Sequence, residues 1–172
     1  IFQALTPIVF AKLGPVTAGQ IGLGLAIFNG VQSVGMSWMY TKTARYAELV
    51  VSGERDLLNV TFLNALKRSV AMVTLGVVSV WIAFALMDAL GWSILNRLPA
   101  LEVLVCLGLV TLINSVIFSV ALYMRSHKEE PMLVASVVGG ALTLAGVYVG
   151  ASYSAFAVAL IYLLATLLVG LP

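Results

Sequence analysis

Two rows of small polar side chains lie inside long apolar stretches, and they are the residues of this chain best suited to bind a ligand. In each row a first residue, Asn29 or Thr111, is followed by polar residues three, four and eight positions later. These intervals put each row on one face of a helix. Since an unpaired polar group in hydrocarbon is costly, such rows face protein or a water-filled cavity. The eight candidate cavity-lining residues are Asn29, Gln32, Ser33, Ser37, Thr111, Asn114, Ser115 and Ser119.

The chemistry of the two rows is that of neutral hydrogen-bonding groups. Amides and hydroxyls suit sugar hydroxyls better than a bare cation. Two interpretations stay open: the rows bond to each other across helices, or they line a cavity. Coupling to a proton or sodium gradient usually requires a carboxylate inside the membrane. Asp88 and Glu102 are the only candidates, but both lie within about one turn of a stretch end, where water reaches them.

Catalytic and cofactor chemistry has no evident residues. The chain has one His and one cysteine, Cys106, with no Cys/His/Asp cluster at metal-ligand spacing. We therefore expect a protein that is not an enzyme and that has no metal or cofactor. The net charge is only +2, and no basic helix face with interleaved aromatic residues is present, which argues against a nucleic-acid partner.

The composition predicts an all-α membrane protein. Apolar residues make up 62% of the chain and charged residues 9%, whereas a soluble domain is about half apolar and about a quarter charged. A membrane span needs about 20 apolar residues. The first stretch would rise only about 16 Å as a helix, so we expect missing chain before it. We predict a single bundle, 1–172, of six spans at about 1–11, 17–40, 69–90, 100–124, 132–149 and 154–171.

The basic residues indicate how the bundle faces. Seven of the nine Lys and Arg residues lie in segments 42–68 and 125–131, and the other two lie in 12–16 and 91–99. The rich and poor loops alternate with the predicted crossings, as the positive-inside rule requires. We therefore expect 42–68, 125–131 and the C-terminus in the cytoplasm, and 12–16, 91–99 and 150–154 on the other side.

Segment 42–68 mixes charges with apolar residues, and Ser52-Gly53 divides it into two pieces. An apolar stripe at helical spacing predicts an amphipathic element that lies on the membrane surface. Its residues are Leu57, Leu58, Phe62 and Leu66.

Rows of small residues predict where helices approach each other closely. One row repeats every four residues in the second predicted span, and a similar row marks the fifth. They are Ala18, Gly22, Ala26 and Gly30, and Gly139, Thr143, Gly146 and Gly150.

The most distinctive local pattern is the decapeptide LYMRSHKEEP, from Leu122 to Pro131. Arg125, His127 and Lys128 are candidates to anchor a helix end at the lipid headgroups, and Pro131 begins the next helix. A binding site for a phosphate or headgroup is the alternative.

This decapeptide resembles a turn of bacterial polysaccharide (O-antigen) flippases, which reads roughly Ala-Leu-Tyr-Leu-Arg-Ala-His-Lys-Gln-Glu-Pro. Residues 7–22, with Gly14-Pro15, and residues 37–49 resemble other parts of that family. The departures are Met124, Ser126 and Glu129. The family belongs to the multidrug, oligosaccharidyl-lipid and polysaccharide exporter superfamily, whose members have two bundles of about six helices.

The resemblance implies that this chain is the C-terminal bundle of a flippase in the bacterial inner membrane. The implied partners are membrane lipids, a lipid-linked glycan substrate and the missing N-terminal bundle. The implied activity is transport of that glycan by alternating access. Two alternatives stay open: a drug or organic-cation antiporter of the same superfamily, and a non-transporting membrane scaffold in polysaccharide assembly.

Overall fold

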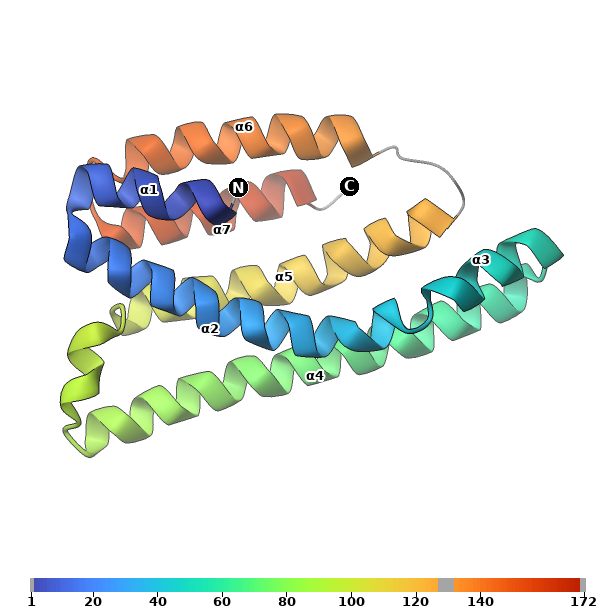
Figure 1. Ribbon diagram of the computed structural model, residues 1–172, viewed down its shortest axis with the longest axis horizontal. Helices are drawn as coiled ribbons and strands as arrows, with labels where there is room; N and C mark the ends of the chain where they lie inside the picture. Colours follow the sequence, from blue (N-terminus) through green and yellow to red (C-terminus); the bar gives the residue numbers. More distant parts are fainter. Residues whose placement is uncertain (1, 127–131, 171–172) are drawn as a thin grey trace.

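The computed structural model describes residues 2–126 and 132–170, and these residues form an all-α protein without a strand. Figure 1 shows long helices that run side by side, with a short 3-10 helix at one end. The elements are α1 (Phe2–Leu13), α2 (Pro15–Tyr40), α3 (Thr43–Ser52), α4 (Arg55–Ala89), η1 (Ser93–Arg97), α5 (Leu101–Ser126), α6 (Met132–Gly150) and α7 (Ala155–Gly170).

Glycines end or separate the helices at the breaks expected from the sequence. Gly14, Gly53 and Gly91 have φ of 88°, 75° and 65°, a left-handed conformation that costs glycine little. Pro15 follows Gly14 as the first residue of α2, where its missing N–H needs no partner. The sequence therefore predicted these three boundaries correctly.

Helix α4 is longer than the predicted span, because it begins at Arg55 instead of near residue 69. Its 35 residues rise about 52 Å, well beyond the thickness of about 30 Å of a hydrocarbon core. No Gly or Pro stands between Arg55 and Arg68, so nothing interrupts the hydrogen-bond ladder. Half of the charged segment 42–68 thus belongs to α4.

The apolar stripe that we expected on the membrane surface packs largely on the protein. Leu58 is 1% exposed and Phe62 is half-buried, whereas Leu57 is 43% exposed. The ring of Phe62 lies between those of Tyr46 in α3 and Tyr123 in α5, with centroids at 6.3 and 4.4 Å. The surface-lying prediction is therefore wrong for Leu58 and Phe62, because α3 and the end of α5 cover this face. The buried members of this second core cluster are Met36, Met39, Tyr46, Leu49, Leu58 and Ala65.

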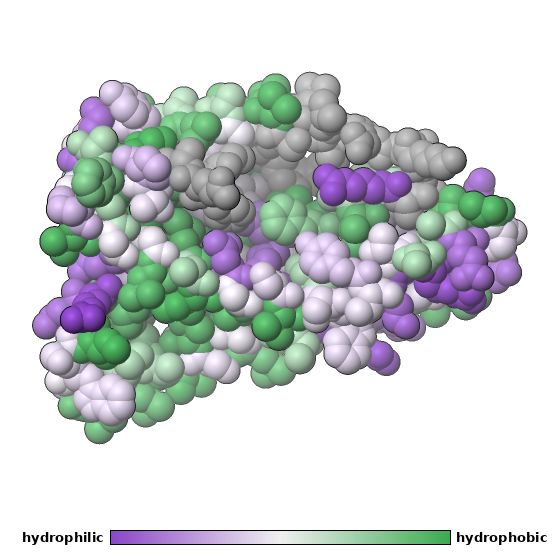
Figure 2. Space-filling view, viewed as in Figure 1, coloured by the Kyte–Doolittle hydropathy of each residue, from purple (hydrophilic) through white to green (hydrophobic). Residues whose placement is uncertain are grey.

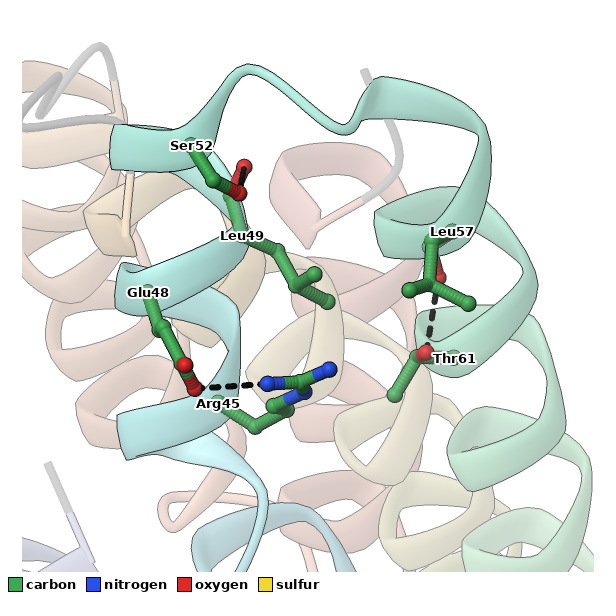
Figure 3. Close-up of polar contacts among 6 residues, drawn as sticks. All are labelled: Arg45, Glu48, Leu49, Ser52, Leu57 and Thr61. Atoms are coloured by element: carbon green, nitrogen blue, oxygen red, sulfur yellow. Dashed lines mark hydrogen bonds and ion pairs between the residues drawn. The ribbon is translucent and has the colours of Figure 1, made fainter.

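Polar side chains of α3 and of the first turns of α4 bond within their own helix (Figure 3). Arg45 and Glu48 form an exposed ion pair at 2.7 Å. The Thr61 hydroxyl donates to the Leu57 carbonyl at 2.7 Å, and the Ser52 hydroxyl donates to the carbonyl of Leu49. These contacts each stay within one helix and do not join α3 to α4.

Helix α5 lies at the centre of the bundle, in contact with α2, α4 and α7 (Figure 1). A first core cluster joins its N-terminal half to the other helices. The glycines at the close approaches are Gly35, which faces Val73; Gly76, which faces Val31; and Gly108, which faces Trp81. The members of the first core cluster on α5 are Val103, Leu104, Cys106, Leu107 and Val110.

The loops gather at two opposite ends of the bundle (Figure 1). At one end Gln20 Nε2 donates to the Asn96 carbonyl at 3.0 Å, and the Lys12 ammonium lies 4.4 Å from the ring centre of Tyr148. At the other end the Tyr123 hydroxyl donates to Asn59 Oδ1 at 2.8 Å. Segments 12–16, 91–99 and 150–154 therefore share the first end, in the arrangement expected from the basic residues.

Two of the described helices, α4 and α5, are long and apolar enough to cross a membrane. They differ in burial: in the most apolar stretch of each, 56% of residues are buried in α5 but only 11% in α4. Figure 2 shows hydrophobic residues over much of the visible face, with hydrophilic residues at both ends and a smaller group between them. The exposed apolar face of α4 includes Met72, Leu75, Val78, Ile82 and Leu86.

Candidate functional site

The polar row on α5 is buried inside the protein. Thr111 is 6% exposed and Asn114 8%, while Ser115 and Ser119 are fully buried. Each of the three hydroxyls donates to a backbone carbonyl three or four residues earlier in α5, at 2.7–2.8 Å. Such local bonds satisfy a hydroxyl in a helix without a cross-helix partner. This row therefore does not present free donors to a ligand.

Gln32 is the member of the α2 row that reaches α5. It is half-buried, and in the amide orientation that pairs both ends Nε2 donates to the Thr111 carbonyl oxygen at 3.1 Å. In the same orientation Oε1 accepts from the backbone N–H of Ser115 at 3.3 Å. One side chain thus serves an acceptor and a donor in the same turn of α5. Bonding across helices occurs here, but it goes to the backbone and not to the other polar row.

The next turn of α2 is also tied to its neighbours by polar contacts. The Ser69 hydroxyl of α4 donates to the carbonyl of Gly35 at 2.9 Å. The hydroxyls of Ser69 and Ser119 each lie 3.6 Å from the Met36 sulfur, a weak acceptor. Residues 32–36 therefore connect α2 to both α4 and α5.

Asn114 makes its side-chain contact with α7. It shares a side-chain hydrogen bond with Tyr162, which is 4% exposed. Sequence reasoning missed Tyr162, because a tyrosine inside an apolar run is indistinguishable from a packing residue. Within the described part of the chain, no buried side-chain nitrogen or oxygen lacks a partner. The buried polar groups at the centre of the bundle are therefore paired within the protein.

The remaining members of the α2 row are on the surface. Asn29, Ser33 and Ser37 are exposed, and the two hydroxyls donate to carbonyls of α2 at 2.8 and 2.7 Å. The Asn29 side chain has no hydrogen-bond partner among the described residues. The structure thus separates Asn29, Ser33 and Ser37 from the α5 row, since these three residues face outward and the α5 row is buried. A cavity lined by both rows is not what the described residues form.

The distinctive decapeptide is only partly described. Arg125 is exposed at the end of α5, and His127 and Lys128 lie outside the described residues. Tyr123, from the same motif, holds the end of α5 against Asn59 and Phe62 of α4. No signal in the sequence pointed to this contact of Tyr123.

The acidic residues lie where the sequence placed them. Asp88 and Glu102 are exposed near the ends of α4 and α5. Cys106 is a buried free thiol. The described residues include no group of three or more His, Cys, Asp or Glu side chains that could hold a metal ion.

Comparison with models of protein families, with curated proteins and with solved structures finds no match for this chain.

Proposed function

We propose that this chain is the C-terminal membrane bundle of a bacterial transporter that moves lipid-linked oligosaccharide or polysaccharide precursors across the inner membrane. The observation that carries the proposal is the exposed apolar face of α4. The core helix of a soluble protein is mostly buried, but only 11% of the most apolar stretch of α4 is. Exposing such a face to water costs about 25 cal/mol for each Å². A bilayer removes that cost.

The charges of α4 fit a membrane-crossing position. The twenty positions from Arg68 to Asp88 rise about 30 Å, which matches a hydrocarbon core of about 30 Å. Between them the exposed polar side chains Thr74 and Ser79 are each bonded to a carbonyl of α4. The part of α4 before Arg68 then extends into the cytoplasm, where α3 packs against it.

The exposed α2 row supports transport. Asn29, Ser33 and Ser37 lie on one face of α2, which runs alongside α4. The exposed surface of α4 is largely apolar over its membrane-crossing part. In a membrane the polar face of α2 requires a protein partner or an aqueous cavity. Amides and hydroxyls match the hydroxyls of a sugar, and the missing N-terminal bundle is the partner that the family resemblance implies. In this arrangement the two bundles alternate in opening to each side of the membrane.

The test is export of glycan by cells that depend on the full-length protein. The triple variant Asn29→Leu, Ser33→Val and Ser37→Val removes the exposed polar row but leaves the contacts of Gln32 with α5. We expect loss of export with unchanged membrane insertion. The matched control is Thr74→Val with Ser79→Val, which removes exposed hydroxyls from the lipid-facing side of α4. Normal export by the triple variant would overturn the cavity assignment.

The burial of the α5 row favours one alternative, a non-transporting membrane scaffold. In that case the triple variant would leave polysaccharide assembly intact, and substitutions on the exposed face of α3 would impair it.

The antiporter alternative predicts that export depends on an ion gradient and is lost in Asp88→Asn. The flippase proposal predicts that Asp88→Asn exports normally, because this residue is exposed at the end of α4.

A further inference from the structure

The Gln32 side chain contacts two backbone groups of α5 that ordinarily bond to each other. In an α-helix the N–H of Ser115 pairs with the carbonyl oxygen of Thr111, four residues earlier. These are the same donor and acceptor that the Gln32 amide serves, at 3.3 and 3.1 Å. A side chain inserted at one ladder position is a recognised cause of helix kinks.

Gln32 makes opening of this ladder position inexpensive. Thr111 and Ser115 are buried, so breaking their backbone bond would ordinarily leave a donor and an acceptor unpaired away from water. The primary amide of Gln32 carries one carbonyl and N–H donors, as a peptide group does. It therefore replaces both lost partners at once.

The two halves of α5 also pack in different places. Residues before 111 belong to the first core cluster, which includes residues of α6 and α7 such as Val147 and Val158. Residues after 119 pack against the second cluster, to which Leu122 and Tyr123 contribute. The polar row separates the two clusters. Its hydroxyls bond to earlier carbonyls of α5, an arrangement that favours bending of a helix.

We propose that α5 bends between Thr111 and Ser115, and that Gln32 is the positioning residue that pairs the opened backbone groups. The bend moves the cytoplasmic half of α5, together with the second cluster, relative to α7. The inference concerns the bundle itself and holds whatever molecule is transported. A bend of about 20° moves Arg125, ten residues beyond the hinge, by about 5 Å.

Proline substitution tests the hinge without a substrate. Ser115→Pro removes the N–H of the opened bond, while Gln32 still pairs the Thr111 carbonyl. Phe118→Pro is the control, since it frees the carbonyl of Asn114, which lies outside the pair of backbone groups that Gln32 contacts. We expect Ser115→Pro to lower the melting temperature by less than half as much as Phe118→Pro. In a Gln32→Met background this difference should vanish. Equal losses in the wild-type background would overturn the proposal.

Distances between spin labels test the movement itself. Labels at Arg125 and Leu168 are both exposed and report the position of the end of α5 relative to α7. We expect two distance populations about 5 Å apart in the otherwise unchanged protein and one in Gln32→Met. The control Ser33→Ala, one residue along α2, should keep both populations. The same distribution with and without Gln32 would contradict the hinge.

Discussion

Gly76 gives a sharp test of how the helices pack. At this position α4 lies so close to α2 that no side chain fits between them. A Cβ added at Gly76 would lie 2.5 Å from Val31 Cγ1, whereas carbon atoms pack at about 3.5–4.0 Å. Val31 is β-branched and held in a helix, so its χ1 angle cannot change easily to relieve the clash. The helices must therefore separate by about 1 Å in Gly76→Ala.

The expected cost follows from two opposing effects. Overpacking of a filled core destabilises by about 1–3 kcal/mol, and replacing glycine by alanine in a helix returns up to about 1 kcal/mol. We expect Gly76→Ala to lower the free energy of unfolding by about 1–2 kcal/mol. Thermal unfolding of the purified protein in detergent measures this difference.

A second substitution and a control isolate the contact. Val31→Ala removes both methyl groups, and the remaining distance from Val31 Cβ to the added Cβ is 3.5 Å, an ordinary contact. The double variant should therefore lose less stability than the sum of the two single variants. Gly30→Ala on α2 has nothing within 4 Å and should be neutral or stabilising. Equal effects of Gly76→Ala and Gly30→Ala, or no rescue by Val31→Ala, would refute the reasoning.

Three further predictions concern the end of the bundle where α3 packs against α4 and α5. Tyr123→Phe should cost about 1 kcal/mol in thermal unfolding, since it removes the hydrogen bond to Asn59, and Asn59→Leu should give no further loss when combined with it. Burial raises the pKa of Tyr46 above its ordinary value, so the stability present below about pH 10 should fall as pH rises further, and Tyr46→Phe should abolish that part of the fall. Arg45→Ala should change stability by less than about 0.5 kcal/mol, because its ion pair with Glu48 is exposed; a larger loss would show that the pair contributes to packing.

Local signals predicted the helix boundaries well. The Gly14-Pro15 step, Gly53 and Gly91 each act through their own backbone geometry, which tertiary packing does not alter. The start of α4 was missed for the opposite reason. Charged residues mark the edge of an apolar span, but charge does not interrupt a helix, and α4 begins as early as Arg55.

Rows of small residues predicted the helix contact of α6 and only part of the contacts of α2. In α6 the predicted row packs on α7, where an added Cβ at Gly146 or Gly150 would lie 2.7 Å from Ile161. In α2, Ala18 is buried and an added Cβ at Gly22 would lie 3.7 Å from Thr6 of α1, but Gly30 is exposed and the close approach to α4 uses Gly35. Spacing alone cannot tell which of several small-residue faces meets a neighbour, since that depends on which helices adjoin.

The candidate site shows the same limit. Spacing correctly placed the α5 polar residues on one face, but it did not reveal that this face is buried or that Gln32 binds backbone groups. Those facts depend on how α2 and α5 are rotated about their axes relative to each other. The sequence of either helix alone does not determine this orientation.

Labelling of single cysteines in intact cells tests most directly whether this chain crosses the membrane as proposed. Cys106 is first replaced by Ala, and then Ser152→Cys at the α6–α7 turn and Ser52→Cys at the end of α3 are introduced separately; both positions are exposed. With a membrane-impermeant maleimide, we expect Ser152→Cys to be labelled in intact cells and Ser52→Cys only after the inner membrane is opened. Equal labelling of both positions in intact cells, or labelling of Ser52→Cys alone, would contradict the proposed arrangement.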